Sequence, residues 1–204
     1  MDNCCGCASL TEGSFQDLHP RISAESKQCS KENHLFHQRC ESAYHIINMY
    51  MERIAPNLAR SCSEVMEMVR CHRDPNGFLS GIKTHYFSHA ICFNAGTKYH
   101  RDDESCWSGF DAIAVFREYG GGELHLKDLG YSFPSCPSDL FFIRGAGFMH
   151  DAIDWKGKGR MVLALFADRA TFFRESVKRP EDLDPIYRGR KRGSFRRQYP
   201  YIAP

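Results

Sequence analysis

Residues that can bind a divalent metal ion occur at two places in this 204-residue chain, one at its middle and one about 50 residues later. His100 and Asp102 are separated by one residue, and alternate residues of a strand point to the same side, so both can reach one ion. A third ligand must come from a distant segment, and His150 is well placed to supply it. Two histidines and one carboxylate leave three positions of an octahedron open, as non-haem iron(II) chemistry with O2 requires. These residues therefore predict an iron(II) site.

An arginine beyond the second histidine strengthens this interpretation. In a chain with ten histidines a His-x-Asp pair also arises by chance, and would then be a solvated turn. Arg160, however, lies ten residues after His150 (160 − 150), directly before the apolar run 161–167. A hairpin would place its guanidinium in the same pocket, where the planar fork can bind a carboxylate through two parallel hydrogen bonds. Because burying an unpaired guanidinium is costly, Arg160 predicts an anionic ligand.

The elements that must position these residues change in type along the chain. Apolar residues at helical spacing predict a helix over about 36–55, ended by Pro56, and a second helix that reaches about residue 71. Short apolar runs between Gly and Pro clusters then predict strands near 86–93, 111–116, 123–126, 139–143 and 161–167. The helices would bury Ile47, Tyr50, Met51, Ile54, Leu58, Cys62, Val65, Met66 and Val69. The order gives an α+β class, a barrel or sandwich with N-terminal helices packed on one sheet.

Three regions follow from this pattern. Residues 1–34 show little periodicity and are expected to form a loose arm. Residues 35–180 form one domain, with helices over 36–71 and the barrel over 83–174. Residues 181–204 form a basic tail.

Composition excludes several classes of protein. With 42% hydrophobic and 25% charged residues, the composition is close to globular averages and argues against a fully disordered chain. No run approaches the ~18 apolar residues of a membrane span, and the first nine residues lack the features of a secretory signal. We therefore expect an intracellular protein, nuclear or cytoplasmic, with reduced thiols. Cys92, Cys106 and Cys136 are then expected to be small buried apolar residues.

The N-terminal cysteines offer a second metal hypothesis. Cys4 and Cys7 form a Cys-x-x-Cys pair, which could hold zinc with a further ligand from Cys29, His34, His37 or Cys40. No second Cys-x-x-Cys supports such a site, and the spacings are irregular, so unpaired thiols are the favoured interpretation.

The complete set of motifs resembles the Fe(II)/2-oxoglutarate dioxygenase superfamily, whose fold is a double-stranded β-helix related to the jelly roll. His-x-Asp, a distal histidine and an arginine ten residues further on are typical of it. Over about residues 83–174 the likeness is more specific, to the fungal branch of the TET/JBP-like dioxygenases. It is carried by Phe93-Asn94, His100-Arg101-Asp102, Phe110-Asp111, Gly121-Gly122-Glu123-Leu124, Phe142-Ile143-Arg144-Gly145, His150 and Trp155 to Arg160. Ser138-Asp139-Leu140 resembles the superfamily's Gly-Asp-apolar entry to the strand before the distal histidine.

This resemblance implies a function and a set of ligands. Fe(II), 2-oxoglutarate and O2 would together hydroxylate a C–H bond, such as the methyl group of 5-methylcytosine or thymine in DNA or RNA. The base would have to be flipped out of its stack to reach the iron. Asn94, Asp103, Trp107 and Phe110 would line the substrate pocket, although Trp107 fits ordinary packing at the barrel rim equally well.

Two positions depart from the family pattern. Ser138 stands where glycine is usual, and Val162 stands where many relatives have a hydroxyl that shares the 2-oxoglutarate carboxylate. Arg160 therefore needs another partner, for which Tyr86 is the candidate. His125 is expected to be a surface or hydrogen-bonded core residue and not a ligand, because it faces away from Leu124 and Leu126.

The substrate class is left open by the sequence. The run 188–197 holds six basic residues and no acid, which suits phosphate contacts but also a solvated tail or a localisation signal. The same chemistry on a protein side chain or a small metabolite is the second hypothesis. A catalytically inactive barrel that acts as a binding module is the third, and the intact ligand set argues against it.

Overall fold

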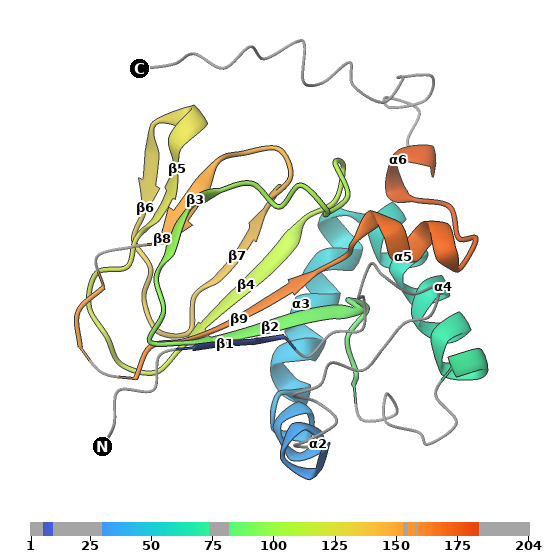
Figure 1. The fold of residues 1–204 in the computed structure, drawn as a ribbon, viewed down its shortest axis with the longest axis horizontal. Coiled ribbons are helices and arrows are strands. Elements are labelled where there is room, and N and C mark those ends of the chain that lie inside the picture. Colours follow the sequence, from blue (N-terminus) through green and yellow to red (C-terminus); the bar gives the residue numbers. More distant parts are fainter. Residues whose placement is uncertain (1–5, 10–29, 74–81, 153–154, 158, 184–204) are drawn as a thin grey trace.

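The computed structural model describes residues 6–9, 30–73, 82–152, 155–157 and 159–183. Two antiparallel sheets face each other, and helices cover the outer side of the larger one (Figure 1). The larger sheet has the order β1 (Gly6–Ser9), β2 (Ser88–Phe93), β9 (Met161–Phe166), β4 (Asp111–Phe116) and β7 (Leu140–Ile143). The smaller has the order β3 (Thr97–His100), β8 (His150–Ala152), β5 (Leu124–Leu126) and β6 (Tyr131–Phe133). The two sheets do not close into a complete barrel, and the predicted α+β class with helices on one sheet is confirmed.

The helical layer is built from three consecutive helices: α2 (Ser30–Arg39), α3 (Glu41–Ile54) and α4 (Pro56–Arg73). The predicted single helix over 36–55 is wrong in one respect, because the backbone turns at Cys40 and divides it. Neither Gly nor Pro marks this break, so sequence signals could not locate it. Pro56 begins α4, as its fixed φ favours at the first position of a helix.

The residues predicted to be buried are all confirmed on α4, but only two of four are confirmed on α3. All five apolar residues predicted inward on α4 are buried. On α3, Ile47 and Met51 are buried, but Tyr50 and Ile54 remain 47% and 46% exposed. The helix buries Tyr44 in their place, so its contact stripe lies one turn nearer the N-terminus than the hydrophobic pattern indicated.

The two cores differ greatly in size. The main core lies between the helices and the larger sheet and includes Leu58, Val65, Ile91, Leu163 and Phe172. The second core supports the smaller sheet with only Leu124, Leu126 and Ile143 fully buried among the described residues. Apolar burial therefore holds the larger sheet firmly and the smaller sheet weakly.

The predicted strands are found within two residues of their expected ends, but two of the three-residue strands were missed. β6 and β8 have three residues each, too few for a periodic signal. β1 corrects the prediction of a loose arm: Gly6–Ser9 pairs with the free edge of β2, a tertiary contact that local sequence does not reveal. The last residues of the predicted arm, 30–34, also depart from the prediction, because they form the first part of α2. Residues 1–5 and 10–29, with Cys4 and Cys29, lie outside the described residues, as does the basic run 188–197.

The remaining elements are a short turn between β5 and β6 and two helices near the C-terminal end of the described chain. They are a 3-10 turn (Lys127–Leu129), α5 (Arg169–Arg174) and α6 (Pro180–Leu183). Cys106 is buried as predicted, whereas Cys92 is half-buried and Cys136 is exposed. The prediction is wrong for Cys136 because it sits in the proline-flanked turn before β7 and not on a strand. Within the described residues, no helix combines the length and apolar character needed to cross a bilayer.

A cluster of buried polar rings joins the helices to β2. His37 Nδ1 lies 2.6 Å from the Tyr44 hydroxyl, and the His37 and His89 ring centroids are 5.4 Å apart. The ring of His89 lies 3.1 Å, through Nε2, from the carbonyl oxygen of Tyr86. Burial lowers the pKa of His37 to about 4 and that of His89 to about 3, so both are neutral in the folded protein.

The protein should lose stability as the pH falls below about 6.5. In this range the unfolded chain binds protons at His37 and His89, whereas in the folded protein the two rings stay neutral until the pH reaches about 4 and about 3. The free energy of unfolding therefore falls as the pH is lowered. The expected loss is up to about 1.4 kcal/mol per pH unit for each histidine. Urea unfolding at pH 7.5, 6.5 and 5.5 measures it, with the exposed His45→Gln as a control of unchanged slope. A His89→Gln variant with the slope of the wild type would contradict the assignment.

Candidate metal centre

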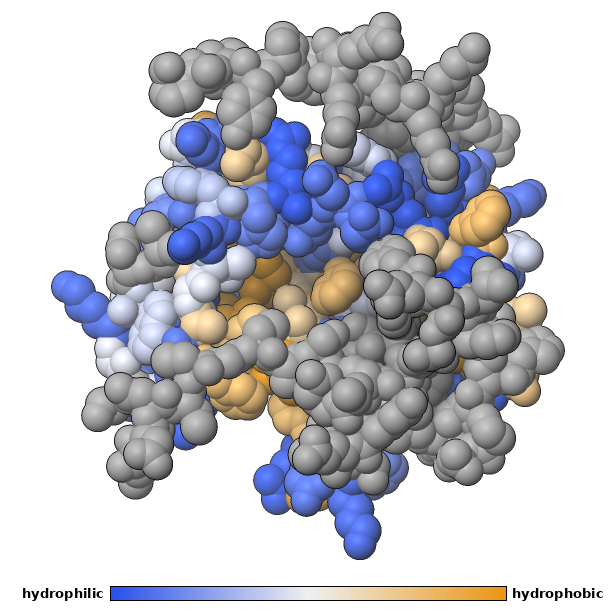
Figure 2. Space-filling model, in the orientation of Figure 1, coloured by the Kyte–Doolittle hydropathy of each residue, from blue (hydrophilic) through white to orange (hydrophobic). Residues whose placement is uncertain are grey.

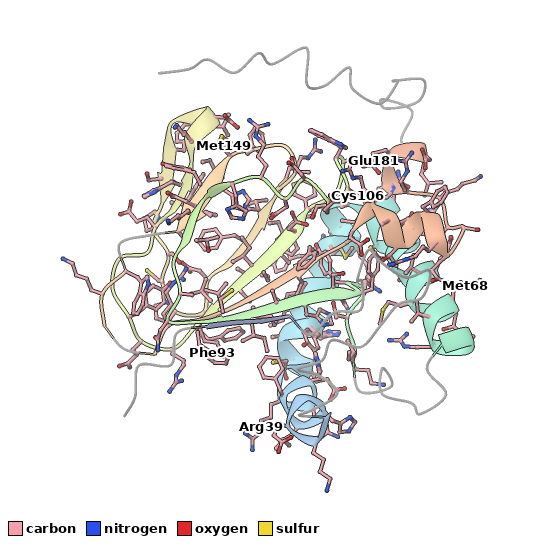
Figure 3. All side chains as sticks on the ribbon, viewed as in Figure 1. Arg39, Met68, Phe93, Cys106, Met149 and Glu181 are labelled. Carbon is pink, nitrogen blue, oxygen red and sulfur yellow. The ribbon has the colours of Figure 1, made fainter. Side chains whose placement is uncertain are left out.

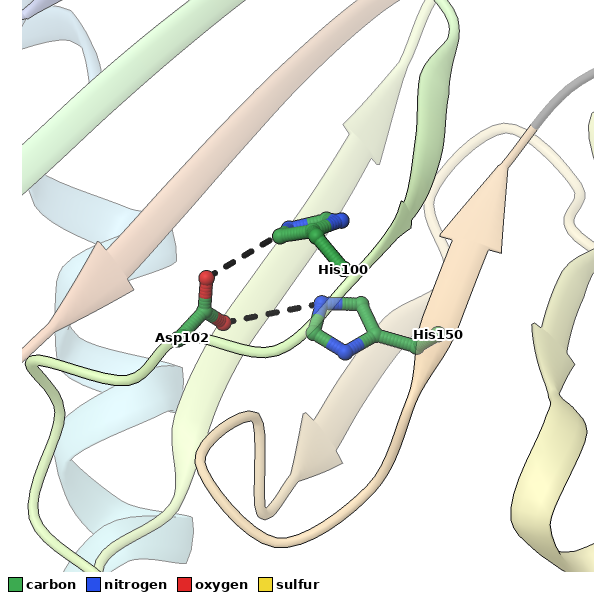
Figure 4. Close-up of side chains that lie close together, drawn as sticks. All are labelled: His100, Asp102 and His150. Carbon is green, nitrogen blue, oxygen red and sulfur yellow. Dashed lines mark ion pairs between the residues drawn. The ribbon is translucent and has the colours of Figure 1, made fainter. Parts of the chain in front are cut away.

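The three predicted metal ligands lie together in the structure. One ligand atom from each of His100, Asp102 and His150 lies within 4.8 Å of the other two. His100 Nε2 is 3.4 Å from Asp102 Oδ1, and His150 Nε2 is 3.5 Å from Asp102 Oδ2 (Figure 4). Both histidines come from the smaller sheet, where the pairing of β3 with β8 sets His100 opposite His150. Asp102 follows β3 in the loop, so it reaches the site from beyond the strand and not by strand alternation.

Hydrogen bonds to the backbone fix the tautomer of both histidines. His100 Nδ1 lies 2.7 Å from the carbonyl oxygen of Lys98, and His150 Nδ1 lies 3.0 Å from that of Phe148. A carbonyl only accepts, so each Nδ1 carries the proton and each Nε2 keeps its lone pair. Both lone-pair atoms belong to the cluster with Asp102, and such partners orient metal-bound histidines in proteins. The donor set therefore fits a divalent transition metal, with two imidazoles and one carboxylate.

A second carboxyl group shares the space behind Asp102. Asp111, at the start of β4, is buried and accepts a hydrogen bond from Ser105 Oγ at 3.1 Å. Burial raises the pKa of Asp111 well above its usual range, and the charge of Asp102 raises it further. Burial also acts to raise the pKa of Asp102, but the neighbouring imidazoles of His100 and His150 outweigh it and lower that pKa. Asp111 is thus the protonated member of the pair and Asp102 the ionised one.

Gly145 provides the space in which the two carboxyl groups meet. Its carbonyl accepts a hydrogen bond of 3.0 Å from the Asp102 amide. A Cβ at this position would overlap Oδ2 of both Asp102 and Asp111. The turn after β7 therefore has to carry a residue without a side chain.

Arg101, which lies between His100 and Asp102 in the sequence, links their segment to the one that leads into β8. Its guanidinium donates to Asp128 Oδ2 at 2.7 Å and to the carbonyl of Gly147 at 3.2 Å. The same Asp128 oxygen accepts the Met149 amide at 2.8 Å. Arg101 and Asp128 thus link the His-x-Asp segment to the residues just before His150.

The loop that carries Asp102 is anchored at its other end by the C-terminal helices. The Trp107 amide donates to Glu181 Oε1 at 2.5 Å, and the Cys106 amide donates to the Ala167 carbonyl at 3.2 Å. Figure 3 shows Cys106 and Glu181 at this end, near α5 and α6, and Met149 at the opposite side of the fold. Residues 101–110 are therefore held at both ends.

A cavity of about 240 Å³ opens between the sheets and contains the metal cluster. Its polar lining includes His100, Asp102, His150, Arg160 and Ser135. Its apolar wall comes from the larger sheet and includes Ile113, Val115, Val162, Ala164 and Phe166. A hollow with apolar side chains beneath a hydrophilic rim is visible in Figure 2. The cavity thus combines the metal cluster with a cationic group and an apolar wall.

Arg160 lies in this cavity, as the sequence predicted, and is only 4% exposed. Nη1 donates to the Ala95 carbonyl at 2.9 Å, and the guanidinium carbon lies 5.4 Å from the Tyr119 ring centroid. Nε has no hydrogen-bond partner among the described residues. Gly122 lets the arginine pass, since a Cβ there would come within 3.3 Å of Nε. A buried cation with an unused donor is suited to an anionic ligand.

Tyr86 does not share this anion site, and that prediction is corrected. Its hydroxyl donates to the Phe110 carbonyl at 2.6 Å, and its ring is buried in the main core beneath the helices. Ser135 is better placed, because it lines the cavity and its Oγ lies 2.7 Å from the hydroxyl of Tyr119, the ring beside Arg160. Ser135 lies in a proline-rich turn, so no periodic signal marks it in the sequence.

The four predicted substrate-pocket residues have other positions. Among the described residues that line the cavity, Asn94, Asp103, Trp107 and Phe110 do not occur. Asn94 Oδ1 accepts the Gly159 amide at 2.8 Å, and the carbonyl of Asp103 accepts from Arg169. The ring of Phe110 lies under Arg144, 5.0 Å from its guanidinium carbon. All four therefore support the walls and the loop from outside the cavity.

His125 behaves as predicted. Its Nδ1 lies 2.7 Å from Asp151 Oδ1, and it is absent from the metal cluster. It is a hydrogen-bonded residue of β5 and not a ligand.

No family model and no curated protein matches the chain. Among solved structures, it is similar to NgTET1 in complex with 5mC DNA, with a TM-score of 0.59 and 13% sequence identity. The match covers 81% of this chain and 61% of that chain, so it spans less than two thirds of the NgTET1 structure. The chain has the double-stranded β-helix fold. At this identity the likeness defines the fold, and it agrees with the TET/JBP-like resemblance of the sequence.

Two other solved structures match over shorter parts. One is an oxidoreductase of the 2OG-Fe(II) oxygenase family from Burkholderia pseudomallei (TM-score 0.35, 16% identity, 51% of this chain and 56% of that chain). The other is a Cupin 2 conserved barrel domain protein from Salinispora arenicola (TM-score 0.32, 13% identity, 44% of this chain and 69% of that chain). The assignment of the double-stranded β-helix does not depend on either.

Gly145→Ala should weaken metal binding roughly 10- to 100-fold, the range typical of changes to groups that support metal ligands. The added methyl displaces the carboxyl groups of Asp102 and Asp111. Titration of the protein with Co(II), followed by its visible absorption, measures the affinity. Gly120→Ala is the matched control, because a Cβ there meets no atom within 4 Å. An unchanged affinity in a folded Gly145→Ala protein would show that Asp102 is not a ligand.

Proposed function

We propose that the chain is an Fe(II)- and 2-oxoglutarate-dependent dioxygenase that hydroxylates the methyl group of a methylated nucleobase in DNA or RNA. The observation that carries the chemistry is the cavity itself. It holds two histidines whose Nε2 lone pairs are fixed beside Asp102, together with a buried arginine. A non-catalytic barrel has no need of this combination.

His100, Asp102 and His150 would hold the iron, and Arg160 would bind the distal carboxylate of 2-oxoglutarate. When bound, the iron supplies oxidative decarboxylation of 2-oxoglutarate with O2 and hydroxylation of a C–H bond. Ser135 would replace the hydroxyl that Val162 lacks, donating to the carboxylate beside Arg160. Asn94 and Ala95 hold Arg160 from behind, through the Asn94 amide to the Arg160 carbonyl (2.9 Å) and the Ala95 carbonyl to Nη1.

Electrostatics favour this ligand set. With Asp111 protonated, the positive charges of the dication and Arg160 balance the negative charges of Asp102 and the 2-oxoglutarate dianion. Burial lowers the pKa of His150, which keeps its imidazole neutral and able to bind metal. An ionised Asp111 would add an uncompensated charge to the site, which burial disfavours.

The choice of a methylated base rests on two supports. The fold is that of NgTET1, whose solved structure holds 5mC DNA. The cavity wall opposite the metal cluster is apolar, with Ile113, Val115 and Phe166, and suits a methyl group. Because the cluster lies inside a cavity, a base in a duplex must be extruded to reach it. An intracellular site of action agrees with such a substrate.

The decisive experiment is mass spectrometry of methylated and unmethylated oligonucleotides after incubation with Fe(II), 2-oxoglutarate and O2. We expect hydroxymethylated product and succinate only with the methylated oligonucleotide, and neither with His100→Ala or Asp102→Ala. Succinate formed with a peptide or metabolite, but not with nucleic acid, would keep the chemistry and overturn the substrate. Failure to bind Fe(II) or turn over 2-oxoglutarate would overturn both.

Arg160→Met should raise the 2-oxoglutarate requirement roughly 10- to 100-fold, because a charge-assisted hydrogen-bonded pair is lost. Ser135→Ala should raise it about 2- to 10-fold, the effect of one neutral hydrogen bond. Steady-state succinate formation at varied 2-oxoglutarate gives both values. Arg60→Met, on the exposed face of α4, is the control. An equal 2-oxoglutarate requirement for Ser135→Ala and wild type would show that a group other than Ser135 is the second partner of the carboxylate.

A further inference from the structure

The outer side of α3 carries apolar side chains that face solvent. Ile46, Met49, Tyr50 and Ile54 are each between 41% and 47% exposed. Their spacing of three and four residues places them on one face of the helix, and we call this set the α3 stripe. The ring of Tyr50 lies 6.2 Å from that of Phe142, so the stripe continues to β7, the edge strand of the larger sheet.

The inner side of α3 is apolar as well. Tyr44, Ile47 and Met51 are buried in the main core. A helix that is apolar on both sides is normally covered on both. The neighbouring α4 shows the usual pattern, because its inner side is apolar and its outer side exposes charged residues such as Arg60 and Glu64. α3 therefore presents a surface for a partner that α4 does not.

The α3 stripe is as large as the apolar patches that mediate association. Four side chains exposed to this degree present roughly 350 Å² of apolar surface, within the range of the largest patch on a typical monomer. Interfaces are roughly 60% apolar, so one such stripe on each of two chains corresponds to a total interface of roughly 1,200 Å². This area lies at the lower end for specific association, so a dimer formed through it would be reversible.

The charges at the two ends of α3 favour a second copy of this chain as the partner. Glu41 lies in the first turn and Arg53 in the last turn, and both are exposed. A two-fold axis at right angles to the helices makes two copies of α3 run antiparallel. Each Glu41 then lies towards Arg53 of the other copy, whereas a parallel pair would bring like charges together.

We propose that two copies of this chain associate through the α3 stripe in an antiparallel, two-fold arrangement. The stripe provides the apolar contact, and two Glu41–Arg53 contacts fix its direction. Because α3 covers the outer side of the larger sheet, away from the smaller sheet, both cavities stay open in the dimer (Figure 1). The association leaves each metal cluster unchanged and does not rest on the proposed function.

Sedimentation equilibrium of the full chain over about 1–100 µM measures this association. We expect the mass of one chain at the lowest concentration and of two chains at the highest. Ile46→Glu should keep the mass of one chain throughout, because it places a charge in the apolar contact, and its melting temperature should not change. Phe173→Glu, which alters an 82% exposed ring on α5, is the matched control and should associate like the wild type.

Exchanging the charges at the ends of α3 tests the direction of the contact. Arg53→Glu or Glu41→Arg should raise the dissociation constant roughly 10-fold, because a symmetric dimer loses two attractive contacts and gains two repulsive ones. Both changes in the same chain should restore the wild-type value, because the two charges have then changed places.

Other outcomes overturn the proposal or part of it. A wild-type chain that keeps the mass of one chain at about 100 µM would refute the dimer. If Ile46→Glu also lowered the melting temperature of that monomer, a segment of the same chain outside the described residues would cover the stripe.

Two results concern the arrangement of the dimer. A dimer that Ile46→Glu leaves intact would place the contact on another surface and overturn the proposal. A double charge variant that associates no more tightly than the single variants would overturn the antiparallel direction. Because none of these measurements needs turnover, an inactive dimer would count against the proposed function only.

Discussion

The pairing of β3 with β8 is the constraint on which the site depends. It sets His100 opposite His150, and two backbone carbonyls then orient the imidazoles so that both lone pairs lie by Asp102. A shift of this register by one residue would turn one histidine to the other face of the sheet. The Arg101–Asp128 ion pair, which also binds the Met149 amide, keeps the two strands from slipping.

The larger sheet supplies the apolar wall of the cavity and the packing against the helices, which the smaller sheet lacks. Its inner face forms the apolar cavity wall and its outer face packs on the helices, so it is a rigid base. Arg160 directly precedes β9, and β4 begins with the protonated Asp111. The cation and the neutral acid are thus placed by the firmest part of the fold, while the metal ligands belong to the sheet and loop that face it.

The sequence predicted the ligands better than the walls. His100, Asp102, His150 and Arg160 lie in one cavity as expected, because the types and separations of these residues are specific to one kind of chemistry. The strands near 111–116 and 161–167 were predicted from apolar runs. The pocket residues Asn94, Asp103, Trp107 and Phe110 were wrong because nearness in sequence to a ligand does not determine which side of a loop faces the cavity. Ser135, Tyr119 and the β1–β2 contact depend on tertiary placement, which local patterns do not contain. The break at Cys40 has the same origin, since packing and not a helix breaker bends the chain there.

The small core of the second sheet has a consequence for dynamics. Within the described part of the chain, the core beneath that sheet has only Leu124, Leu126 and, from β7 of the larger sheet, Ile143 as buried apolar residues. The smaller sheet therefore gains little from apolar burial. An ion held by His100, Asp102 and His150 would cross-link β3 to β8 and serve in place of a core. Binding of the ion and ordering of the smaller sheet are then coupled, so the rate of amide hydrogen exchange in this sheet reports how much of the protein holds an ion.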